Sequence, residues 1–403
     1  MASLPCGSAC PGRLVLPMGD DMHTHLRQGK LMEAVTPLIR RGGCNRVVVM
    51  PNTIPPIVTC GQALAYREKL LQQDSKVDYL MTLYLSPEVD CKDILENAKK
   101  SHVVGVKLYP RGVTTNSDSG VEDLSGFHPV FKTLETCGLT LHIHGEQVGA
   151  ELLRAEELFL PAFEEIHSKY PDLKIVFEHI STAAAVRAVR GKRNVAATIT
   201  AHHLRLTIAD VLASEEVERH IKEAASGARS FPPTVCCPHN FCKPIAKLQQ
   251  DRDELLRVVR EGDPQFFLGS DSAPHPRHKK EAEPPAAGVF TQPLLLAVST
   301  PLLRMAVPPV QDLACGAAAC CPFCAQYLAD TLSRAGCLKN LRAFACELVE
   351  GEDCVVLDPT PCRVPSVFGE EEGLAEELVP FLAGEELAFS ARIVPFTESL
   401  LEK

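Results

Sequence analysis

Short apolar runs rich in β-branched residues recur along the chain, and a helical or irregular segment follows each of them. Eight such runs are present, at 13–18, 46–50, 79–85, 103–109, 139–144, 173–179, 195–200 and 265–271. Helical patterns occupy several of the intervals, at 60–73, 128–137, 185–192 and 251–262. Strands that alternate with helices indicate parallel pairing, so eight such units predict an α/β fold of the (β/α)8 TIM-type barrel. An open doubly wound sheet is the alternative, but the chain lacks the Gly-x-Gly-x-x-Gly turn of that fold.

Residue types that bind metals lie at the ends of most of these runs. In a barrel of this type, the carboxyl ends of the strands carry the chemistry. The residues are His23 and His25 after the first run, Lys107 in the fourth, His144 and His179 closing the fifth and sixth, and Asp271 closing the eighth. Their shared position predicts a metal site at the mouth of the barrel.

The pair His23 and His25 is the most specific local signal. Side chains two residues apart on a strand point to the same face, so both imidazoles can reach one ion, and this pattern suits Zn2+. His142 lies one layer deeper than His144, and we expect it to pack behind the ligands. His202 and His203 end the seventh run; metal ligation there is the less favoured interpretation, and one of them could orient a neighbouring group.

Lys107 and Asp271 supply the charge that four imidazoles lack. A buried ammonium is costly, so Lys107 either extends to the barrel rim or has a lowered pKa. A neutral amine could take up CO2 and form an anionic carbamate that bridges two cations. Asp271 is the last ligand candidate and the natural general acid/base beside a metal-activated water, although an aspartate at this position could also cap a helix.

Arg27, Asn52 and His275 lie just past the ends of the first, second and eighth runs. Arg27 can hold a carboxylate by two parallel hydrogen bonds and Asn52 can add another, although a surface ion pair would explain Arg27 equally well. Thr114 and Thr115 lie in a small polar loop after the fourth run, with glycines on both sides. Such a loop could close over a substrate and exclude water.

Composition restricts the class of protein further. The net charge of −10 argues against a nucleic-acid partner, and the sequence contains no apolar stretch long enough to span a membrane. The 17 cysteines are scattered and odd in number, and the N-terminus lacks the pattern of a secretory signal. We therefore expect reduced thiols and a cytoplasmic location, with a short organellar leader as the open alternative.

Several segments, taken together, resemble the amidohydrolase superfamily and, within it, the single-function dihydroorotases of bacterial and fungal type. The segments are "DDMHTHLRQG", "VVMPNTIPP", "VKLYPRGVTTNSDSGV", "LHIHGE", "IVFEHIST", "AATITAHHL", "PHNFCKPIAK" and "FLGSDSAPHPRHKKE". They extend from about residue 19 to about residue 293, with a weaker match in "LVPFLAGEELAF" near the end. The resemblance thus covers the predicted barrel.

The resemblance implies a site with two zinc ions and assigns its residues. His23, His25, Asp271 and carboxylated Lys107 would bind one zinc, and Lys107, His144 and His179 the other. Substrate contacts would come from Arg27, Asn52, His275, the backbone at Lys243 and Ala287, and the loop bearing Thr114 and Thr115. The implied reaction interconverts N-carbamoyl-L-aspartate and L-dihydroorotate plus water, with a bridging hydroxide as nucleophile, in pyrimidine (UMP) biosynthesis.

Three other functions are weighed against this one. A hydantoinase acts on a neutral ring that needs no carboxylate clamp, so Arg27 and Asn52 disfavour it. A non-catalytic scaffold on the same barrel would be expected to lose ligands, whereas all six candidates are present. A redox or zinc module at the "CPFC" of 321–324 lacks a second ligand pair at zinc-finger spacing.

The chain is expected to divide into four parts. Residues 1–18 would form a leader and the entry to the first strand, and 19–293 the catalytic barrel. Residues 294–325 would be a variable insertion rich in Cys, Ala and Pro, and 326–403 a helical and extended segment packing on the barrel. A homodimer is an expectation from the resemblance alone.

Overall fold

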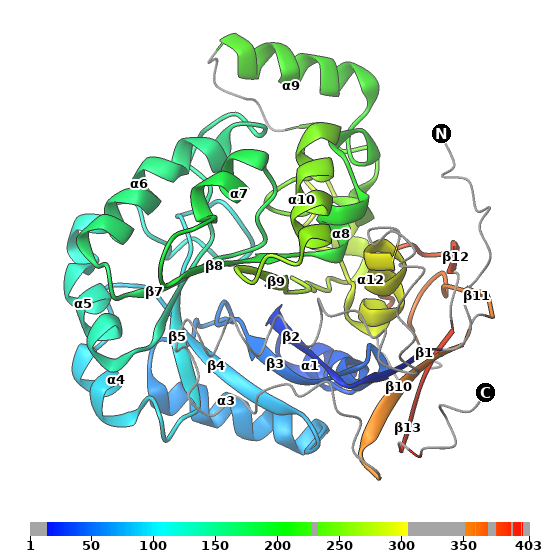
Figure 1. Cartoon of the computed structure of the whole chain (residues 1–403), viewed down its shortest axis with the longest axis horizontal. Coiled ribbons are helices and arrows are strands. Elements are labelled where there is room, and N and C mark those ends of the chain that lie inside the picture. The colour runs from blue at the N-terminus through cyan, green and yellow to red at the C-terminus, as the bar shows by residue number, and fades with distance from the viewer. Residues whose placement is uncertain are drawn as a thin grey trace.

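The computed structural model describes residues 14–226, 233–304, 351–358, 360–369, 376–387, 390–395 and 397. Eight parallel strands form one sheet in the order of the chain, and helices surround it on the outside (Figure 1). The strands are β2 Gly19–Thr24, β3 Cys44–Val49, β4 Asp78–Tyr84, β5 Val103–Leu108, β6 Thr140–Ile143, β7 Lys174–Phe177, β8 Val195–Ile199 and β9 Phe266–Leu268. The fold is therefore the predicted (β/α)8 barrel.

The barrel closes between its first and last strands through the residues that follow β9. The Asp271 amide donates to the His23 carbonyl at 2.8 Å, and Thr24 forms a bridge with Ser272. The close approach of β5 to β6 requires a glycine at Gly105, because a Cβ there would lie 2.3 Å from the Thr140 carbonyl oxygen. These contacts hold the carboxyl ends of distant strands in one fixed rim.

The helices are α1 Gly29–Val35, α2 Leu38–Arg41, α3 Cys60–Gln73, α4 Cys91–Asn97, α5 His128–Cys137, α6 Ala155–Lys169, α7 Ala183–Val189, α8 Ala201–Arg205, α9 Ser214–Ser226, α10 Gln249–Glu261, α11 Arg277–Lys280 and α12 Leu295–Arg304. Short 3-10 turns are η1 Leu124–Phe127, η2 Ile208–Asp210, η3 Pro238–Asn240 and η4 Gln292–Leu294. The predicted helices 60–73 and 128–137 coincide with α3 and α5. A capping box of Thr59 and Gln62 begins α3, and Gly138 in the left-handed conformation ends α5.

The prediction for the first strand was wrong. We expected the run 13–18 to be the first barrel strand, but β1 Leu14–Pro17 lies in a separate antiparallel sheet with β10 Asp353–Asp358 and β13 Ser390–Pro395. The first barrel strand is β2, in which Asp20 and Asp21 are buried. A second small sheet pairs β11 Cys362–Arg363 with β12 Glu386–Leu387.

The C-terminal part of the chain is described only in pieces. Of the predicted insertion 294–325, residues up to 304 belong to η4 and α12, and 305–325, including the "CPFC", lie outside the described residues. The division of the chain into four parts stays a prediction. The nine cysteines among the described residues are free thiols.

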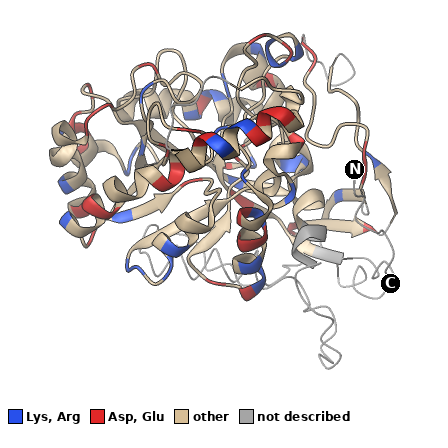
Figure 2. Ribbon diagram, turned by 90° about the horizontal axis from the view of Figure 1, so that it is seen from above, with Lys and Arg blue, Asp and Glu red and all other residues tan. Residues whose placement is uncertain are grey.

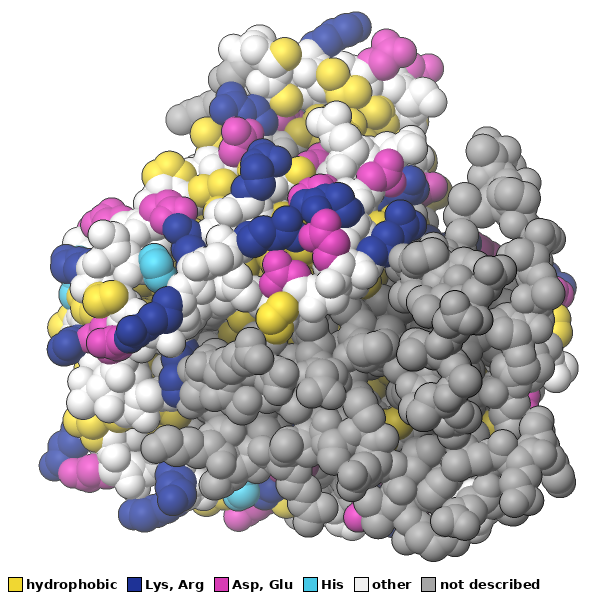
Figure 3. Space-filling view, in the orientation of Figure 1, with side chains coloured by type: hydrophobic (Ala, Val, Ile, Leu, Met, Phe, Trp, Pro, Cys, Tyr) yellow, Lys and Arg dark blue, Asp and Glu magenta, His cyan; other side chains and the backbone are white. Residues whose placement is uncertain are grey.

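The described surface is of mixed charge. Acidic and basic residues both occur along the outer helices (Figure 2), and their side chains intermingle on the face in view (Figure 3). Among the described residues, no helix combines the length and the apolar character needed to cross a bilayer.

Candidate metal centre

The structure brings the six predicted metal ligands to the same end of the barrel. They come from five strand ends: His23 in β2 and His25 just after it, Lys107 in β5, His144 after β6, His179 after β7 and Asp271 after β9. All six side chains are buried. His179 and Asp271 adopt positive φ angles of 38° and 46°, an uncommon conformation for non-glycine residues.

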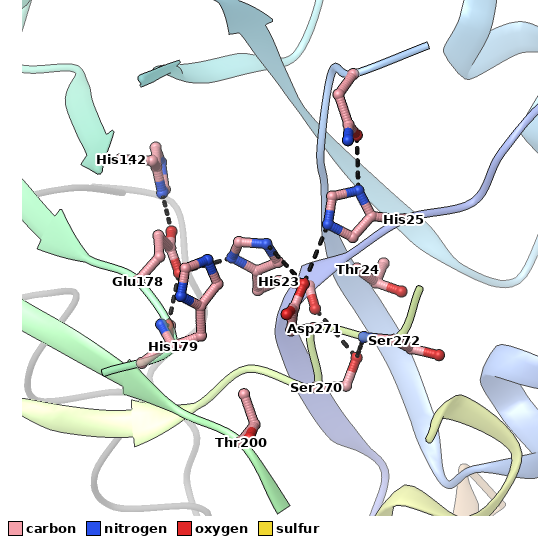
Figure 4. A network of polar contacts seen from close by, with 12 residues as sticks. His23, Thr24, His25, His142, Glu178, His179, Thr200, Ser270, Asp271 and Ser272 are labelled. Carbon is pink, nitrogen blue, oxygen red and sulfur yellow. Dashed lines mark hydrogen bonds and ion pairs between the residues drawn. The ribbon is translucent and has the colours of Figure 1, made fainter. Parts of the chain in front are cut away.

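Four imidazoles lie in a row across the mouth of the barrel. The ring centroids are 5.3 Å apart for His25 and His23, 5.0 Å for His23 and His179, and 4.7 Å for His179 and His144. Asp271 lies against one end of the row: its Oδ1 is 3.1 Å from Nε2 of His25 and 3.4 Å from Nε2 of His23 (Figure 4). Ligand atoms of His23, His179 and Asp271 all lie within 4.8 Å of one another, close enough for one ion.

Lys107 is fully buried, and its Nζ has no hydrogen-bond partner among the described residues. Burial lowers the pKa of this amine to about 8, although the negative charges of Glu178 and Asp271 act to raise it. A neutral amine is therefore accessible near neutral pH, and a neutral amine is the form that can react with CO2.

Glu178 supports the centre from behind. Its two carboxylate oxygens contact Nδ1 of His23 at 2.8 Å and Nδ1 of His142 at 2.6 Å, and Thr198 donates to it at 2.6 Å. Burial alone raises the pKa of Glu178, but the neighbouring histidines hold it well below its usual range. A carboxylate on Nδ1 leaves Nε2 of His23 directed at the ion site, the arrangement usual behind metal-bound histidines.

Two further side chains fix the outer imidazoles. Nδ1 of His25 lies 2.7 Å from the Asn52 side-chain oxygen, and Nε2 of His144 lies 2.7 Å from Glu146. Burial raises the pKa of Glu146, yet the charge of Lys243 and the His144 hydrogen bond bring it down to about 2. Each contact orients its imidazole through one ring nitrogen, and the other nitrogen of His25, Nε2, faces Asp271 at 3.1 Å.

Sequence reasoning missed Glu178 and Glu146. Each is a carboxylate adjacent to, or two residues from, a predicted ligand, and this proximity was the only available signal.

The residues present fit a divalent metal centre. Nε2 of His23, Nδ1 of His179 and Nζ of Lys107 are buried polar atoms without a hydrogen-bond partner among the described residues. Unpaired buried nitrogens are unfavourable unless they bind something, and neutral imidazole with carboxylate is the donor set that zinc prefers. Burial lowers the pKa of His25 to about 4 and that of His179 well below its usual range, so both rings carry lone pairs.

The predicted substrate residues form a continuous chain of contacts beside this centre. Arg27 contacts Nε2 of His275 at 3.0 Å, and the same nitrogen is 3.0 Å from the Ala287 carbonyl. Thr115 donates to that carbonyl at 3.2 Å, and Nδ2 of Asn52 donates to the Thr115 carbonyl at 3.0 Å. Hydrogen bonds thus connect the residues at these strand ends with the loop after β5.

Thr114 and Lys243 lie differently. The backbone of Thr114 bonds within its own loop, donating to the Ser117 hydroxyl at 3.0 Å and accepting from it at 2.6 Å. Lys243 precedes a cis peptide bond to Pro244, and its charge acts on Glu146.

Lys280 is another residue that sequence reasoning missed. It lies in the basic run "PRHKKE" but is buried, and its Nζ donates to three carbonyls, of Phe241 at 3.0 Å, Ala286 at 2.8 Å and Gly288 at 2.6 Å. Two of these residues flank Ala287. Nothing in the sequence distinguishes Lys280 from its exposed neighbour Lys279.

Comparisons with known proteins agree with this arrangement. The family described as "Amidohydrolase" matches residues 68–229. A probable dihydroorotase of Schizosaccharomyces pombe is 40% identical over 381 residues, covering 93% of this chain and 97% of the relative. The dihydroorotase of Saccharomyces cerevisiae is 33% identical, again over 93% of this chain and 97% of the relative.

Solved structures of dihydroorotases are also similar to this chain. The crystal structure of dihydroorotase in complex with 5-fluoroorotic acid from Saccharomyces cerevisiae has a TM-score of 0.79 at 33% identity, covering 96% of this chain and 100% of that one. An L-hydantoinase from Arthrobacter aurescens, at a TM-score of 0.69 and 15% identity over 94% of this chain and 84% of that one, shares the fold alone. The near-complete coverage by relatives above 30% identity places the chain in the dihydroorotase family of amidohydrolases.

Proposed function

We propose that the chain is a zinc-dependent cyclic amide hydrolase that interconverts N-carbamoyl-L-aspartate and L-dihydroorotate plus water in pyrimidine biosynthesis. The observation that carries the proposal is the row of four buried imidazoles with Asp271 at one end and, in the same barrel mouth, a buried lysine amine that has no hydrogen-bond partner in the described part of the chain. The relatives that match almost the whole chain are named dihydroorotases. A homodimer in the cytoplasm belongs to the same proposal.

Two zinc ions would be held by the four imidazoles of the row together with Asp271 and Lys107. His23, His25, Asp271 and Lys107 would hold one, and Lys107, His144 and His179 the other, with Lys107 carboxylated so that it contributes a negative charge to both. When bound, the ions would polarise the ring carbonyl and lower the pKa of a water molecule. The support for carboxylation is a lysine amine that is buried, unpaired among the described residues and easily deprotonated.

Asp271 would act as the general acid/base. Burial raises its pKa, but the His25 hydrogen bond and the nearby histidines hold it below its usual range, so the resting side chain is ionised. In the hydrolytic direction it accepts the proton of the attacking water and delivers it to the departing ring nitrogen. In the cyclising direction the same carboxylate removes that proton from the carbamoyl nitrogen.

Arg27 would hold the substrate carboxylate. Its guanidinium contacts a neutral imidazole, because burial and the Arg27 charge lower the pKa of His275 to about 2. Among the described residues, Arg27 forms no ion pair within bonding distance, so its positive charge is available to an anion. Asn52, His275, the backbone at Ala287 and Lys243, and the loop with Thr114 and Thr115 would surround the ring.

The test is an absorbance assay of dihydroorotate hydrolysis on protein expressed with sufficient zinc, with a hydantoin as the matched neutral substrate. We expect about two zinc ions per chain by elemental analysis, turnover of dihydroorotate, and little turnover of the hydantoin. Arg27→Met should raise the KM for dihydroorotate without reducing the zinc content. Protein stripped of metal that still hydrolyses dihydroorotate would refute the mechanism.

A further inference from the structure

A second cluster of metal-ligating side chains lies outside the centre described above. His202 and His203 belong to α8, directly after β8, and Cys242 lies in the segment between η3 and α10. One ligand atom from each of the three lies within 4.8 Å of the other two, and all three side chains are buried. Cys242 Sγ is 3.9 Å from Nε2 of His203.

His202 is the unexplained member of this cluster. The side chain is fully buried, and neither of its ring nitrogens has a hydrogen-bond partner among the described residues. The ring packs at 4.7 Å from the His203 ring and at 6.3 Å from Phe381. A buried imidazole with both nitrogens unsatisfied is destabilising, and a bound ion would supply the missing partner.

We propose that His202, His203 and Cys242 form a separate metal site that takes a borderline-soft divalent ion such as Zn2+, Co2+ or Cd2+. Two imidazoles and one thiolate are a donor set that such ions favour over Mg2+ or Ca2+, and three protein ligands leave one position open. The site differs chemically from the first centre, whose candidate ligands contain no sulfur.

Binding releases one proton from the thiol. Cys242 Sγ now donates to the Pro244 carbonyl at 3.1 Å, and it becomes a thiolate ligand when that proton leaves to solvent. His203 needs no net proton loss. Its Nε2 contacts the Pro244 carbonyl at 2.9 Å and its Nδ1 contacts the Thr200 hydroxyl at 2.8 Å, so moving the proton from Nε2 to Nδ1 frees Nε2 and keeps the Thr200 contact.

Binding of an ion is therefore linked to the hydrogen bonds of the Pro244 carbonyl. The Pro244 carbonyl accepts from both Cys242 and His203, and an ion withdraws both donors at once. The ion and the Pro244 carbonyl compete for the same two side chains.

The test uses holoenzyme with its first centre filled with zinc, to which about one equivalent of Co2+ per chain is added. Thiolate coordinated to Co2+ gives a near-ultraviolet charge-transfer band that nitrogen and oxygen ligands do not give. We expect the band in the unmodified protein and its loss in Cys242→Ser, in which the serine hydroxyl can still donate to the Pro244 carbonyl.

The matched control is Cys60→Ser. Cys60 is also buried, and its thiol also donates to a backbone carbonyl, that of Asp93 at 3.6 Å. The control should keep the band, and His202→Gln should lose it even if Cys242→Ser fails to fold. Absence of the band in the unmodified protein, its persistence in Cys242→Ser or His202→Gln, or its loss in Cys60→Ser would overturn the assignment.

Discussion

Three of the four imidazoles in the metal centre are each oriented by one side chain behind the ring, and these side chains differ in kind. Glu178 holds His23, the neutral amide of Asn52 holds His25, and Glu146 holds His144. A carboxylate partner makes an imidazole a stronger donor than an amide does. Of these three histidines, His25 is therefore expected to be the weakest ligand.

Replacement of Lys107 tests whether its side chain supplies the shared negative charge. Lys107→Ala removes a buried amine that has no hydrogen-bond partner among the described residues, so we expect the fold to persist. Activity should fall by at least about 100-fold, and added short carboxylic acids should restore part of it by occupying the vacated space. Dihydroorotate hydrolysis measured with and without acetate checks this, and activity close to that of the unmodified protein would exclude the bridging role.

Replacement of Lys280 tests a positioning role. Lys280→Met removes the donor to the carbonyls of Phe241, Ala286 and Gly288, so the backbone around Ala287 loses its anchor. A displacement of about 1 Å near a reacting group can reduce the rate on the order of 100-fold. We expect KM for dihydroorotate to rise about tenfold or more, with kcat less affected and zinc content unchanged.

The control for this variant is Lys279→Met, which changes the exposed neighbour in the same short helix. Lys280→Arg should recover part of the affinity, because arginine keeps the charge and several donors. A parallel loss of zinc and fold in Lys280→Met, with no separate rise in KM, would mean that the residue is only structural.

At the scale of elements, the loop from Pro110 to Val121 connects residues of different strands that we propose to contact the substrate. A bridge between Pro110 and Val121 closes its base. Its tip contacts two other segments: Thr115 donates to the Ala287 carbonyl, and Asn116 donates to the Asn52 carbonyl at 2.9 Å. The loop is thus held over the barrel mouth by a few hydrogen bonds rather than by an apolar core, which suits a segment that opens for substrate.

Thr115→Val removes the hydroxyl that anchors the loop and keeps the shape of the side chain. The loss of one hydrogen bond of about 1 kcal/mol should lower kcat/KM about fivefold and leave zinc content unchanged. Thr133→Val in α5 is the control, since that exposed hydroxyl also donates to a backbone carbonyl, of Pro129. Steady-state kinetics of both variants measure the change in kcat/KM. An equal change in Thr115→Val and Thr133→Val would contradict a role for the Thr115 contact.

The pattern of apolar runs was sufficient to predict seven of the barrel strands in place, because these strands are buried on both faces and read as continuous apolar segments. The run 13–18 was misassigned because its strand partner in β10 lies more than 300 residues away. The true first strand does not form a continuous apolar run because it carries two acids, Asp20 and Asp21, whose partners in the fold include Arg46 and Ser270. Such partners are a property of the folded chain.

The same limit applied to the site. The metal-binding residue types could be placed because the end of a strand is visible in the sequence. Glu178, Glu146 and Lys280 could not, because a side chain that supports another residue is recognised by its contacts and not by its type.

At the scale of the whole molecule, the beginning of the described chain and its last strands form one sheet beside the barrel (Figure 1). This sheet contacts the barrel near Gly43, where a Cβ would lie 2.6 Å from Leu296 and 3.1 Å from Val355. The close packing joins β3, α12 and β10 at a single point. The contact lies at the amino-terminal end of β3, away from the metal centre, where residues of a barrel typically serve stability.

Asp20 lies at the same end of the barrel and predicts how stability depends on pH. Burial raises its pKa from 3.8 to about 7, and the Arg46 charge only partly opposes this. The folded chain thus holds a proton that the unfolded chain releases above pH 3.8. The contribution of Asp20 to stability is greatest below pH 3.8 and is lost as the pH rises towards about 7.

Asp20→Asn should therefore stabilise the protein at pH 8, by roughly 1–3 kcal/mol after the weakened Arg46 contact is allowed for, and by much less at pH 4. Thermal or urea unfolding of both proteins across this range measures the difference. Asp78→Asn is the control, because Asp78 contacts the same Arg46 at 3.1 Å but its side chain is 42% exposed. If Asp20→Asn gave the same small change in the free energy of unfolding at pH 4 and pH 8, the surroundings of Asp20 would have to stabilise its ionised carboxylate. The amino-terminal end of the barrel would then not determine how the stability of the protein depends on pH.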